Sequence, residues 1–387
     1  MTRFYGALRR LVVPGLLLAP GVAYAEWGIN MTPGVTEISR KVYDLHMLIF
    51  SICVVIGIVV FGAMIWSIIH HRKSRGMVAE QFHESTLLEI VWTIIPFLIL
   101  VGMAWPATKV LLAMEDFRAS EVNIKVTAYQ WKWRYDYLGE DAQPEFGFFS
   151  TLDAASNAAR QLGSGIDPAT VENYLLNVDN PIVVPTGRKV RLLLTSNDVI
   201  HSWWVPAVGG KKDAIPGYVQ EFWFNIEEPG VYRGQCAELC GRDHGFMPIV
   251  LVAKTPAEYD AWVAERKGGA VAEAAAVEAA ADKLWSRDEL MAKGKEVYDT
   301  FCAACHMPDG SGNPALQAKP IKGGAIATGD LKAHLDIVLH GKPGTAMAAF
   351  GPQMSDLDIA AVVTYERNAF GNDKGDVVQP ADVKAAR

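Results

Sequence analysis

Two long stretches without a charged side chain dominate the hydrophobic pattern of this chain. Asp, Glu, Lys and Arg are absent from residues 45–69 and again from residues 90–108. A helix needs roughly 20 apolar residues to cross the hydrocarbon core of a bilayer. The pattern therefore predicts two transmembrane helices, at about residues 43–70 and 88–110, within an N-terminal segment that spans residues 26–114.

The loop between these stretches carries Arg72, Lys73 and Arg75. An excess of Lys and Arg marks the cytoplasmic side of a membrane protein, whereas acidic residues contribute little. The loop is therefore predicted to be cytoplasmic, and the remainder of the chain is predicted to lie on the outer, periplasmic side of a bacterial inner membrane.

A shorter apolar run precedes the hairpin. Three arginines within the first ten residues are followed by an apolar run over residues 11–18 and by Ala23-Tyr24-Ala25. A charged start, a short apolar run and an A-x-A site are typical of a secretory signal peptide. Residues 1–25 are therefore predicted to be cleaved; a first membrane helix is the alternative, but the run is too short to span.

After residue 114 the hydrophobic period changes to two. Val122, Ile124 and Val126 alternate with polar residues, and further short apolar runs are separated by Pro- and Gly-containing turns. Short strands punctuated in this way are typical of an all-β sandwich. Residues 115–265 are therefore predicted to form such a domain, with an insertion at residues 146–176 that lacks the alternation and holds some helix.

The composition shifts again near the C-terminus. Eight of the twelve residues 270–281 are alanine, which favours a helix but provides no apolar stripe for a core. Residues 266–285 are predicted to be a semi-rigid helical linker, residues 286–371 a small all-α domain and residues 372–387 a tail. The predicted fold class is therefore multidomain: a transmembrane hairpin, a β-sandwich and a helical domain.

Composition and charge narrow the function classes. Half of the 387 residues are hydrophobic and 20% are charged, which excludes an intrinsically disordered chain. The net charge of −7 argues against non-specific binding of nucleic acid. Residues 115–265 hold 13 basic and 21 acidic residues, a net charge of −8. An acidic surface of this kind steers a basic partner towards it.

A C-x-x-C-H sequence lies in the predicted helical domain, at Cys302, Cys305 and His306. This spacing attaches haem c through two thioethers, with the histidine as an iron ligand. The alternatives are a redox disulfide and a zinc site. Met347, in a Gly-Thr-Ala-Met loop, is the predicted ligand on the far side of the haem. The weaker candidates for that position are Met354, His334 and His340.

A second cluster of metal-binding residue types lies in the predicted sandwich. Soft and borderline ligands of this kind suit copper or zinc. A mononuclear blue-copper site uses one cysteine, so this cluster has one too many, and a second thiolate can bridge two metals. A Cys2His2 zinc site and a disulfide remain alternatives. The cluster comprises Cys236, Cys240, His244 and Met247, with His201 upstream in a His-Ser-Trp-Trp-Val-Pro stretch.

With the two-helix hairpin, these motifs resemble subunit II of the haem-copper cytochrome c oxidases, and the C-terminal segment resembles the fused cytochrome c domain of the caa-type enzymes. The resemblance implies a cupredoxin fold and a binuclear copper centre, CuA. It also implies that a Mg²⁺ shared with subunit I is held by the Glu238 side chain. The implied copper ligands are Cys236 and Cys240 as bridging thiolates, His201, His244 and Met247, and the backbone carbonyl of Glu238.

Two further residues acquire candidate roles from the resemblance. Trp131, in Gln-Trp-Lys-Trp, matches the point where electrons arrive from cytochrome c, although alternating aromatics on a strand are more often core residues. Lys132 stands where relatives often have an aromatic residue. Glu89 matches the mouth of a proton pathway into subunit I; the alternative is an acid favoured by the helix dipole.

The predicted function is therefore electron input to a membrane terminal oxidase. Electrons would pass from cytochrome c and the fused haem c to CuA and on to subunit I, where O2 is reduced; subunit III is a further expected partner. The alternatives are the electron-input subunit of a CuA-type nitric-oxide reductase and a membrane-anchored copper-delivery protein. Nine scattered histidines do not supply the second copper cluster that a nitrous-oxide reductase needs.

Overall fold

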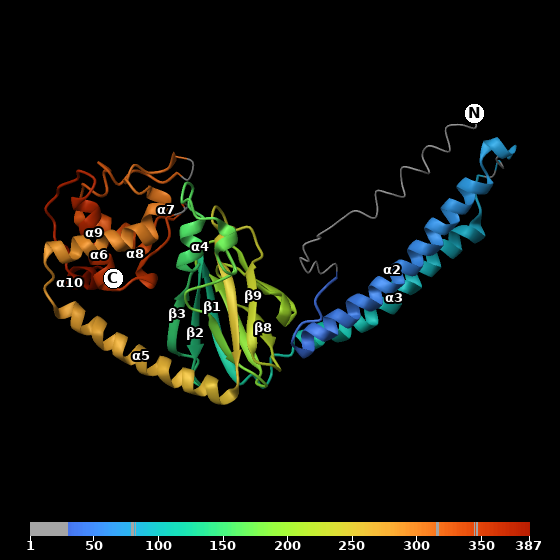
Figure 1. Cartoon of the computed structure of the whole chain (residues 1–387), viewed down its shortest axis with the longest axis horizontal. Helices are drawn as coiled ribbons and strands as arrows, with labels where there is room; N and C mark the ends of the chain where they lie inside the picture. The colour runs from blue at the N-terminus through green and yellow to red at the C-terminus, as the bar shows by residue number, and fades with distance from the viewer. Residues whose placement is uncertain (1–29, 79–80, 82, 315–316, 344, 346) are drawn as a thin grey trace.

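The computed structural model describes residues 30–78, 81, 83–314, 317–343, 345 and 347–387 (Figure 1). It consists of a helical hairpin, a β-sandwich, a long connecting helix and a C-terminal helical domain, in that order along the chain. The predicted signal peptide, residues 1–25, lies outside the described residues.

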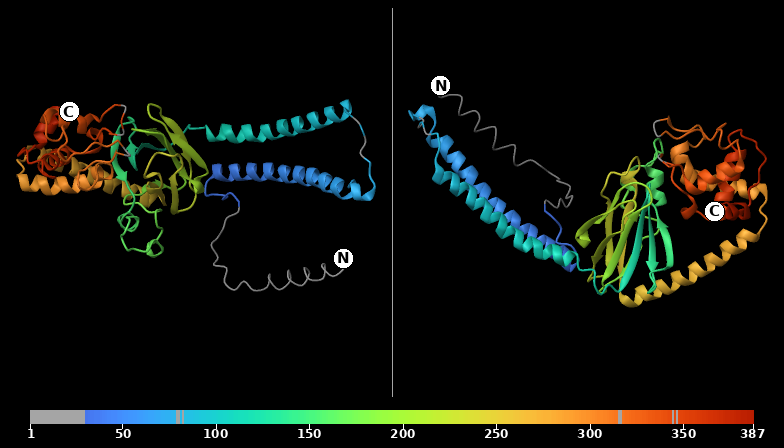
Figure 2. Two further views of the ribbon diagram at one scale, coloured as in Figure 1. Left: turned by 90° about the horizontal axis from the view of Figure 1, so that it is seen from above. Right: turned by 180° about the vertical axis from the view of Figure 1, so that it is seen from behind.

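The hairpin is formed by α2 (Glu37–His70) and α3 (Thr86–Met114), joined through the short helix η1 (Lys73–Arg75). Both long helices are apolar enough to cross a membrane, and they run side by side away from the sandwich (Figure 2). Thr36 caps α2 through the amide of Ser39, and its hydroxyl donates to the Val208 carbonyl at 3.1 Å. This contact joins the base of the first span to the sandwich.

The β-sandwich consists of two five-stranded sheets. One has the order β3-β2-β1-β5-β8 and the other the order β4-β10-β9-β6-β7. β1 pairs in parallel with β5 and antiparallel with β2, so it lies at the centre of its sheet. The strands are β1 (Val122–Tyr129), β2 (Lys132–Leu138), β3 (Pro144–Ser150), β4 (Ile182–Pro185), β5 (Val190–Ser196), β6 (His201–Val205), β7 (Gly210–Ala214), β8 (Gln220–Phe224), β9 (Gly230–Cys236) and β10 (Pro248–Lys254).

The alternating residues of the strands fill the space between the two sheets. The burial of β5 alternates strictly between buried and half-buried positions, as a strand with one face on the core requires. Trp133 of β2 and Trp203 of β6 are fully buried and face each other's sheets within one continuous core. The two packed sheets therefore form a rigid core, and the connecting loops lie at its two ends.

The insertion begins later than its sequence pattern indicates. Residues 146–150 form most of β3, which pairs with β2, so the interpretation of this stretch as non-strand is wrong. Phe146 and Phe148 of this strand pack against Trp262. They do not alternate with polar residues, so the period-two pattern of a strand is not visible in the sequence. Helix in the insertion occurs at α4 (Ala154–Ala159) and at η2 (Pro168–Thr170).

The connecting helix α5 runs from Pro256 to Asp282 and so begins before residue 266. A capping box of Thr255 and Glu258 starts it. Trp262, in its second turn, packs against Tyr137 of the sandwich and against Tyr259 of the first turn, which is part of the same buried core. The N-terminal part of α5 is thus attached to the sandwich, and its Ala-rich part spans the gap to the C-terminal domain (Figure 1).

The C-terminal domain is built from short helices around a second core. α6 and α9 cross so closely at Gly294 of α6 that a side chain there would overlap the Ala361 carbonyl of α9. The elements are α6 (Arg287–Val297), the π-helical turn η5 (Tyr298–Cys302), α7 (Ala303–His306), α8 (Leu331–His340), η7 (Gly351–Gln353), α9 (Asp356–Asn368) and α10 (Pro380–Ala386).

Replacing Gly294 with Ala is expected to lower the local stability of α6 and α9 by about 1–3 kcal/mol, the usual cost of overpacking a core. Native-state hydrogen exchange of the amides in these helices measures the effect. Gly268→Ala is the matched control, because open space surrounds Gly268 within α5. That change should instead stabilise its helix by about 0.5–1 kcal/mol. Equal protection in both variants would contradict the close crossing.

Candidate metal centre

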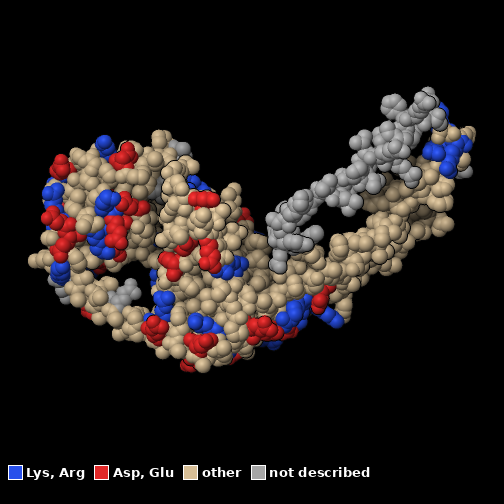
Figure 3. All heavy atoms as spheres, viewed as in Figure 1, with Lys and Arg blue, Asp and Glu red and all other residues tan. Residues whose placement is uncertain are grey.

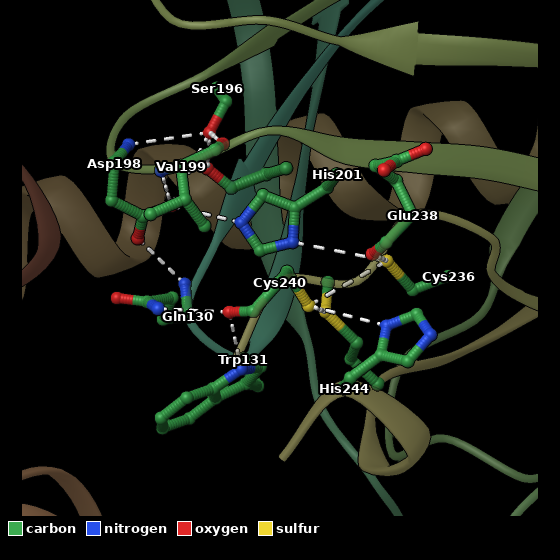
Figure 4. Close-up of polar contacts among 12 residues, drawn as sticks. Gln130, Trp131, Ser196, Asp198, Val199, His201, Cys236, Glu238, Cys240 and His244 are labelled. Atoms are coloured by element: carbon green, nitrogen blue, oxygen red, sulfur yellow. Dashed lines mark hydrogen bonds and ion pairs between the residues drawn. The ribbon is translucent and has the colours of Figure 1, made fainter. Parts of the chain in front are cut away.

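The five metal-binding side chains predicted in the sandwich come together at one end of it, and Figure 4 labels four of them, His201, Cys236, Cys240 and His244. His201 begins β6, Cys236 ends β9 and Met247 immediately precedes β10. Cys240 and His244 lie in the connection between β9 and β10. We call residues 236–247 the ligand loop. Two neighbouring strands of one sheet therefore bring the loop and His201 together.

The two cysteine sulfurs form the centre of the cluster. Cys236 Sγ and Cys240 Sγ lie 3.8 Å apart. His201 Nδ1 lies 3.9 Å from the first sulfur and His244 Nδ1 lies 3.4 Å from the second. Met247 Sδ is 3.7 Å from Cys240 Sγ. Each sulfur thus has an imidazole nitrogen beside it, and both sulfurs are buried.

All five cysteines, which lie in the described part of the chain, carry free thiols. A disulfide requires an S–S distance of about 2.05 Å, so Cys236 and Cys240 are too far apart to be bonded. The hydrogen bond from Cys240 lowers the pKa of the Cys236 thiol to about 3. The same hydrogen bond, together with burial, raises the pKa of Cys240. The pair therefore releases one proton readily and retains the second unless a cation compensates its charge.

Asp198 fixes the orientation of the His201 ring from the side opposite Cys236. His201 Nε2 lies 2.9 Å from Asp198 Oδ1, so the protonated Nε2 donates to the carboxylate and Nδ1 is left to face Cys236. Burial lowers the pKa of His201, whereas the hydrogen bonds to Asp198 and Cys236 raise it, and the net direction is upward. A carboxylate behind a histidine is the usual arrangement at metal sites.

The β1–β2 turn holds the ligand loop through the carbonyl of Cys240. Gln130 Nε2 donates to this carbonyl at 2.9 Å and Trp131 Nε1 donates to it at 3.2 Å. Trp133 Nε1 donates to the Met247 carbonyl at 3.2 Å. Trp131 is half-buried, so its indole connects the surface of the sandwich to a ligand residue through one hydrogen bond.

Glu238 uses its two polar groups in different directions (Figure 4). The Cys236 thiol lies 3.4 Å from the Glu238 carbonyl oxygen, which therefore faces the cluster. The carboxylate points away from it, is about half-exposed and lies 3.9 Å from Lys211 Nζ. The backbone of Glu238 is thus placed among the predicted ligands and its side chain is not.

The donor set fits copper. Two thiols, two imidazoles and a thioether are soft to borderline donors, which select copper or zinc over magnesium or calcium. A closed structural zinc site takes four donors and leaves Met247 Sδ and the Glu238 carbonyl without a role. Two cysteine sulfurs, each with one imidazole nitrogen beside it, could together hold a pair of metal ions.

The second predicted centre lies in the C-terminal domain. The π-helical turn η5 and α7 carry Cys302, Cys305 and His306. His306 Nδ1 lies 2.8 Å from the Lys319 carbonyl oxygen, so Nδ1 donates and Nε2 is left as the ligand nitrogen. This is the tautomer that an iron-binding histidine of a c-type haem needs.

The candidates for the far side of the haem lie in different environments. Met347 is half-buried in a loop, and two residues of its Gly-Thr-Ala-Met sequence, 344 and 346, lie outside the described residues. Met354 is buried in the core of the domain. His334 is also buried and lies 2.8 Å from Glu366 Oε2, whereas His340 is exposed near Asp336. Met347 stays the predicted ligand.

Glu89 lies in the first turn of α3, and its amide donates to the carbonyl of the N-cap residue Ser85. Its position at the start of the span agrees with both of its predicted roles and selects neither.

The sequence did not reveal two residues of this site. Asp198 and Gln130 contact each other as well as the cluster. The backbone amide of Gln130 donates to Asp198 Oδ2 at 2.7 Å. Asp198 stands three residues before His201, and a turn of that length returns its carboxylate to the imidazole. This spacing was the available signal for Asp198; for Gln130 the signal was its place beside Trp131.

The fold and the cluster define a cupredoxin-like domain that follows a membrane hairpin and carries two cysteines within a cluster of metal-binding residue types. The sequence matches the family described as cytochrome c oxidase subunit II, periplasmic domain, over residues 122–254, and the corresponding transmembrane domain over residues 24–110. Residues 289–365 match the family described as cytochrome c oxidase, cbb3-type, subunit III. The chain belongs to the cytochrome c oxidase subunit II family, and a cytochrome c domain follows its cupredoxin domain as in a caa-type fusion.

Relatives extend over both the hairpin and the sandwich. A probable cytochrome c oxidase subunit 2 of Rickettsia bellii is 35% identical over 256 residues, which are 65% of this chain and 90% of the relative. Cytochrome c oxidase subunit 2 of Cereibacter sphaeroides is 32% identical over 248 residues, 62% of this chain and 81% of the relative. The periplasmic domain of subunit II of the Bradyrhizobium japonicum cytochrome oxidase is 36% identical, covers 39% of this chain and 96% of that domain, and has a TM-score of 0.33.

Replacing Asp198 with Asn is expected to weaken copper binding about tenfold, the lower end of the range for residues that orient a ligand. The amide keeps the shape of the carboxylate but removes the charge that supports His201. Competition with a chelator measures the affinity. Asp260→Asn, on α5 and away from the cluster, is the control; equal affinities in the two variants would show that Asp198 has no such role.

Proposed function

We propose that this chain receives electrons through a haem c in its C-terminal domain and passes them to a binuclear copper centre in its sandwich, and from there to subunit I, where O2 is reduced. The approach of the Cys236 and Cys240 sulfurs to 3.8 Å, with one imidazole at each, carries the proposal. Subunit II of this family is the electron-input subunit of an oxidoreductase complex, which supports the same direction of flow.

In this proposal Cys236, Cys240, His201, His244, Met247 and the Glu238 carbonyl hold the copper. Copper bound there would supply one-electron redox chemistry. The residues themselves would limit the structural change that accompanies each electron, because both cysteines, His201 and Met247 are buried and the ligand loop is hydrogen-bonded to the β1–β2 turn and to β2. Cys302 and Cys305 would attach the haem, with His306 and Met347 as its axial ligands.

Trp131 is the proposed point where electrons enter the sandwich. Its indole donates to the Cys240 carbonyl, so a single hydrogen bond joins the ring to a proposed copper ligand. The C-terminal domain lies on the same side: Lys132, the next residue, has its amine 4.3 Å from the ring centre of Phe301 in η5. The haem-attachment sequence begins at the residue after Phe301.

The two spans of the hairpin support the proposed membrane arrangement. With a cytoplasmic loop between them, both proposed redox domains would lie on the periplasmic side of a bacterial inner membrane, where a soluble or membrane cytochrome c would serve as the donor. Subunit I and subunit III are the proposed partners in the membrane. The Glu238 carboxylate, exposed beside the ligand loop, is the proposed contribution to a Mg²⁺ site at the subunit I interface, and Glu89 the proposed start of a proton path.

Purification of the assembly tests the proposal directly. Two coppers with a mixed-valence EPR signal, one haem c per chain and O2 uptake with reduced cytochrome c are expected. A single labile copper would instead identify a copper-delivery protein. Consumption of nitric oxide without O2 uptake would identify the nitric-oxide reductase alternative.

Replacing Trp131 with Leu should slow electron transfer from the reduced haem to copper severalfold, because the aromatic ring and its hydrogen bond to Cys240 are both lost. Rapid mixing followed optically at the haem measures the rate, and EPR of the oxidised copper shows whether the centre is retained. Trp223→Leu, on β8, is the matched control. Unchanged transfer in the Trp131 variant would exclude this route.

Replacing Met347 with His should lower the reduction potential of the haem by a fraction of the ~0.8 V range that axial ligands span. A thioether favours the reduced iron, whereas a second imidazole favours the oxidised iron. Spectroelectrochemical titration measures the potential. Met354→Leu conserves the volume of a core residue and should leave the potential near its original value; the reverse result would assign the ligand to Met354.

A further inference from the structure

The insertion in the sandwich carries an arginine that reaches the ligand loop. Arg160 is the C-cap residue of α4 and follows Ala159, whose side chain is buried. The Arg160 Nε donates to Asn157 Oδ1 at 2.8 Å, one turn earlier, which orients the guanidinium away from the helix. The side chain is 21% exposed, so it is largely enclosed by its neighbours.

Arg160 contacts two residues of the ligand loop. Its Nη2 lies 3.4 Å from Asp243 Oδ2, and the centre of its guanidinium lies 4.3 Å from the ring centre of Phe246. Asp243 immediately precedes His244, and Phe246 immediately precedes Met247. One side chain from a distant segment therefore holds the residue before each of two proposed copper ligands. A planar guanidinium can pair with a carboxylate and stack on an aromatic ring at the same time.

Asp243 is a fixed point of the loop. It is 7% exposed, and its carbonyl accepts the Phe246 amide at 2.9 Å. Arg242 also donates to the Asp243 carboxylate, at 3.1 Å from Nε, but it belongs to the loop itself. The contact with Arg160 instead joins Asp243 to a separate part of the fold, 83 residues away in the sequence.

The segment that carries Arg160 is itself anchored to the sandwich. Ser156 of α4 is fully buried, and its hydroxyl accepts the Leu175 amide at 3.1 Å. Asn177 Oδ1, two residues beyond Leu175, accepts from Arg233 of β9 at 3.1 Å. β9 ends at Cys236. The insertion is thus bonded to the strand that leads into the ligand loop, and Arg160 returns from it to the far end of the same loop.

We propose that Arg160 is a positioning residue that braces the ligand loop through Asp243 and Phe246 and thereby fixes His244 and Met247. The identity of the metal in this inference rests on the proposed function; the bracing of the loop does not.

The test compares three variants of the full chain. Arg160→Gln removes the charge and the stacking, and Arg160→Lys keeps the charge but loses the planar group. Arg188→Gln is the matched control, because Arg188 makes the same pair of contacts, 3.1 Å to Asp260 and 5.6 Å to the ring centre of Tyr259. Arg188 lies beside the start of β1, whereas the ligand loop lies beside the turn after its end.

The first measurement is hydrogen exchange in the copper-free, reduced protein. The His244 and Phe246 amides, which donate to Gly241 and Asp243, are expected to exchange severalfold faster in Arg160→Gln, with amides of β1 and β10 unchanged. Arg160→Lys should lie between this variant and the wild type, and Arg188→Gln should match the wild type in the loop. If Arg160→Gln fails to fold, Arg160→Lys decides the case by the same measurement.

The second measurement is copper affinity by chelator competition, together with the copper hyperfine pattern in EPR. Arg160→Gln is expected to bind copper about 10- to 100-fold more weakly, as is usual when a residue that orients a ligand is lost. Loop exchange in both Arg160 variants equal to that of Arg188→Gln would overturn the inference. Failure of the wild type to bind a copper pair would overturn the proposed function, and the exchange measurement would still decide on the brace.

Discussion

The approach of two cysteine sulfurs to 3.8 Å in the interior of the sandwich is the constraint on which the site depends. Two thiolates at that distance repel each other strongly where water is excluded. The pKa of Cys236 is lowered and that of Cys240 is raised, so the protein alone stabilises one negative charge and not two. Cations between the sulfurs remove this conflict. The surrounding residues therefore have to hold both sulfurs close while keeping them too far apart for a disulfide bond.

The hydrogen bonds around the site meet that requirement through the backbone. Gln130 and Trp131 hold the Cys240 carbonyl, and Trp133 holds the Met247 carbonyl, so the β1–β2 turn and the strand β2 each fix one point of the ligand loop. None of these donors occupies a thiol or a ligand nitrogen. The negative charge of the thiol pair would then be balanced by a bound cation and by the His201 imidazole, whose position Asp198 sets. On the face seen in Figure 3, charged side chains lie over the sandwich, over the C-terminal domain and at the two ends of the hairpin, whereas the middle of the hairpin shows none.

The sequence predicted the parts of the site that lie close together in the chain. Cys236, Cys240, His244 and Met247 fall within twelve residues, so their spacing alone indicates shared chemistry. The alternating apolar residues likewise predicted the sandwich, and the two uncharged apolar stretches predicted the hairpin. Contacts such as that of Arg160 with Asp243 span 83 residues and depend on how the insertion packs, which no local period encodes. The start of α5 was missed for the same reason. Trp262 packs against Phe146 of β3, a contact that the sequence around Trp262 does not indicate.

Lys132, the first residue of β2, connects the sandwich to the C-terminal domain. The Lys132 amine lies 4.4 Å from the ring centre of Phe149 in the sandwich and 4.3 Å from that of Phe301 in the C-terminal domain. Burial lowers the pKa of this amine to about 8, with Asp198 opposing the shift. The Trp131 bond to Cys240, by contrast, lies wholly within the sandwich. Separation of the domains would therefore break the contact at Phe301 and leave the connection from Trp131 to the ligand loop intact.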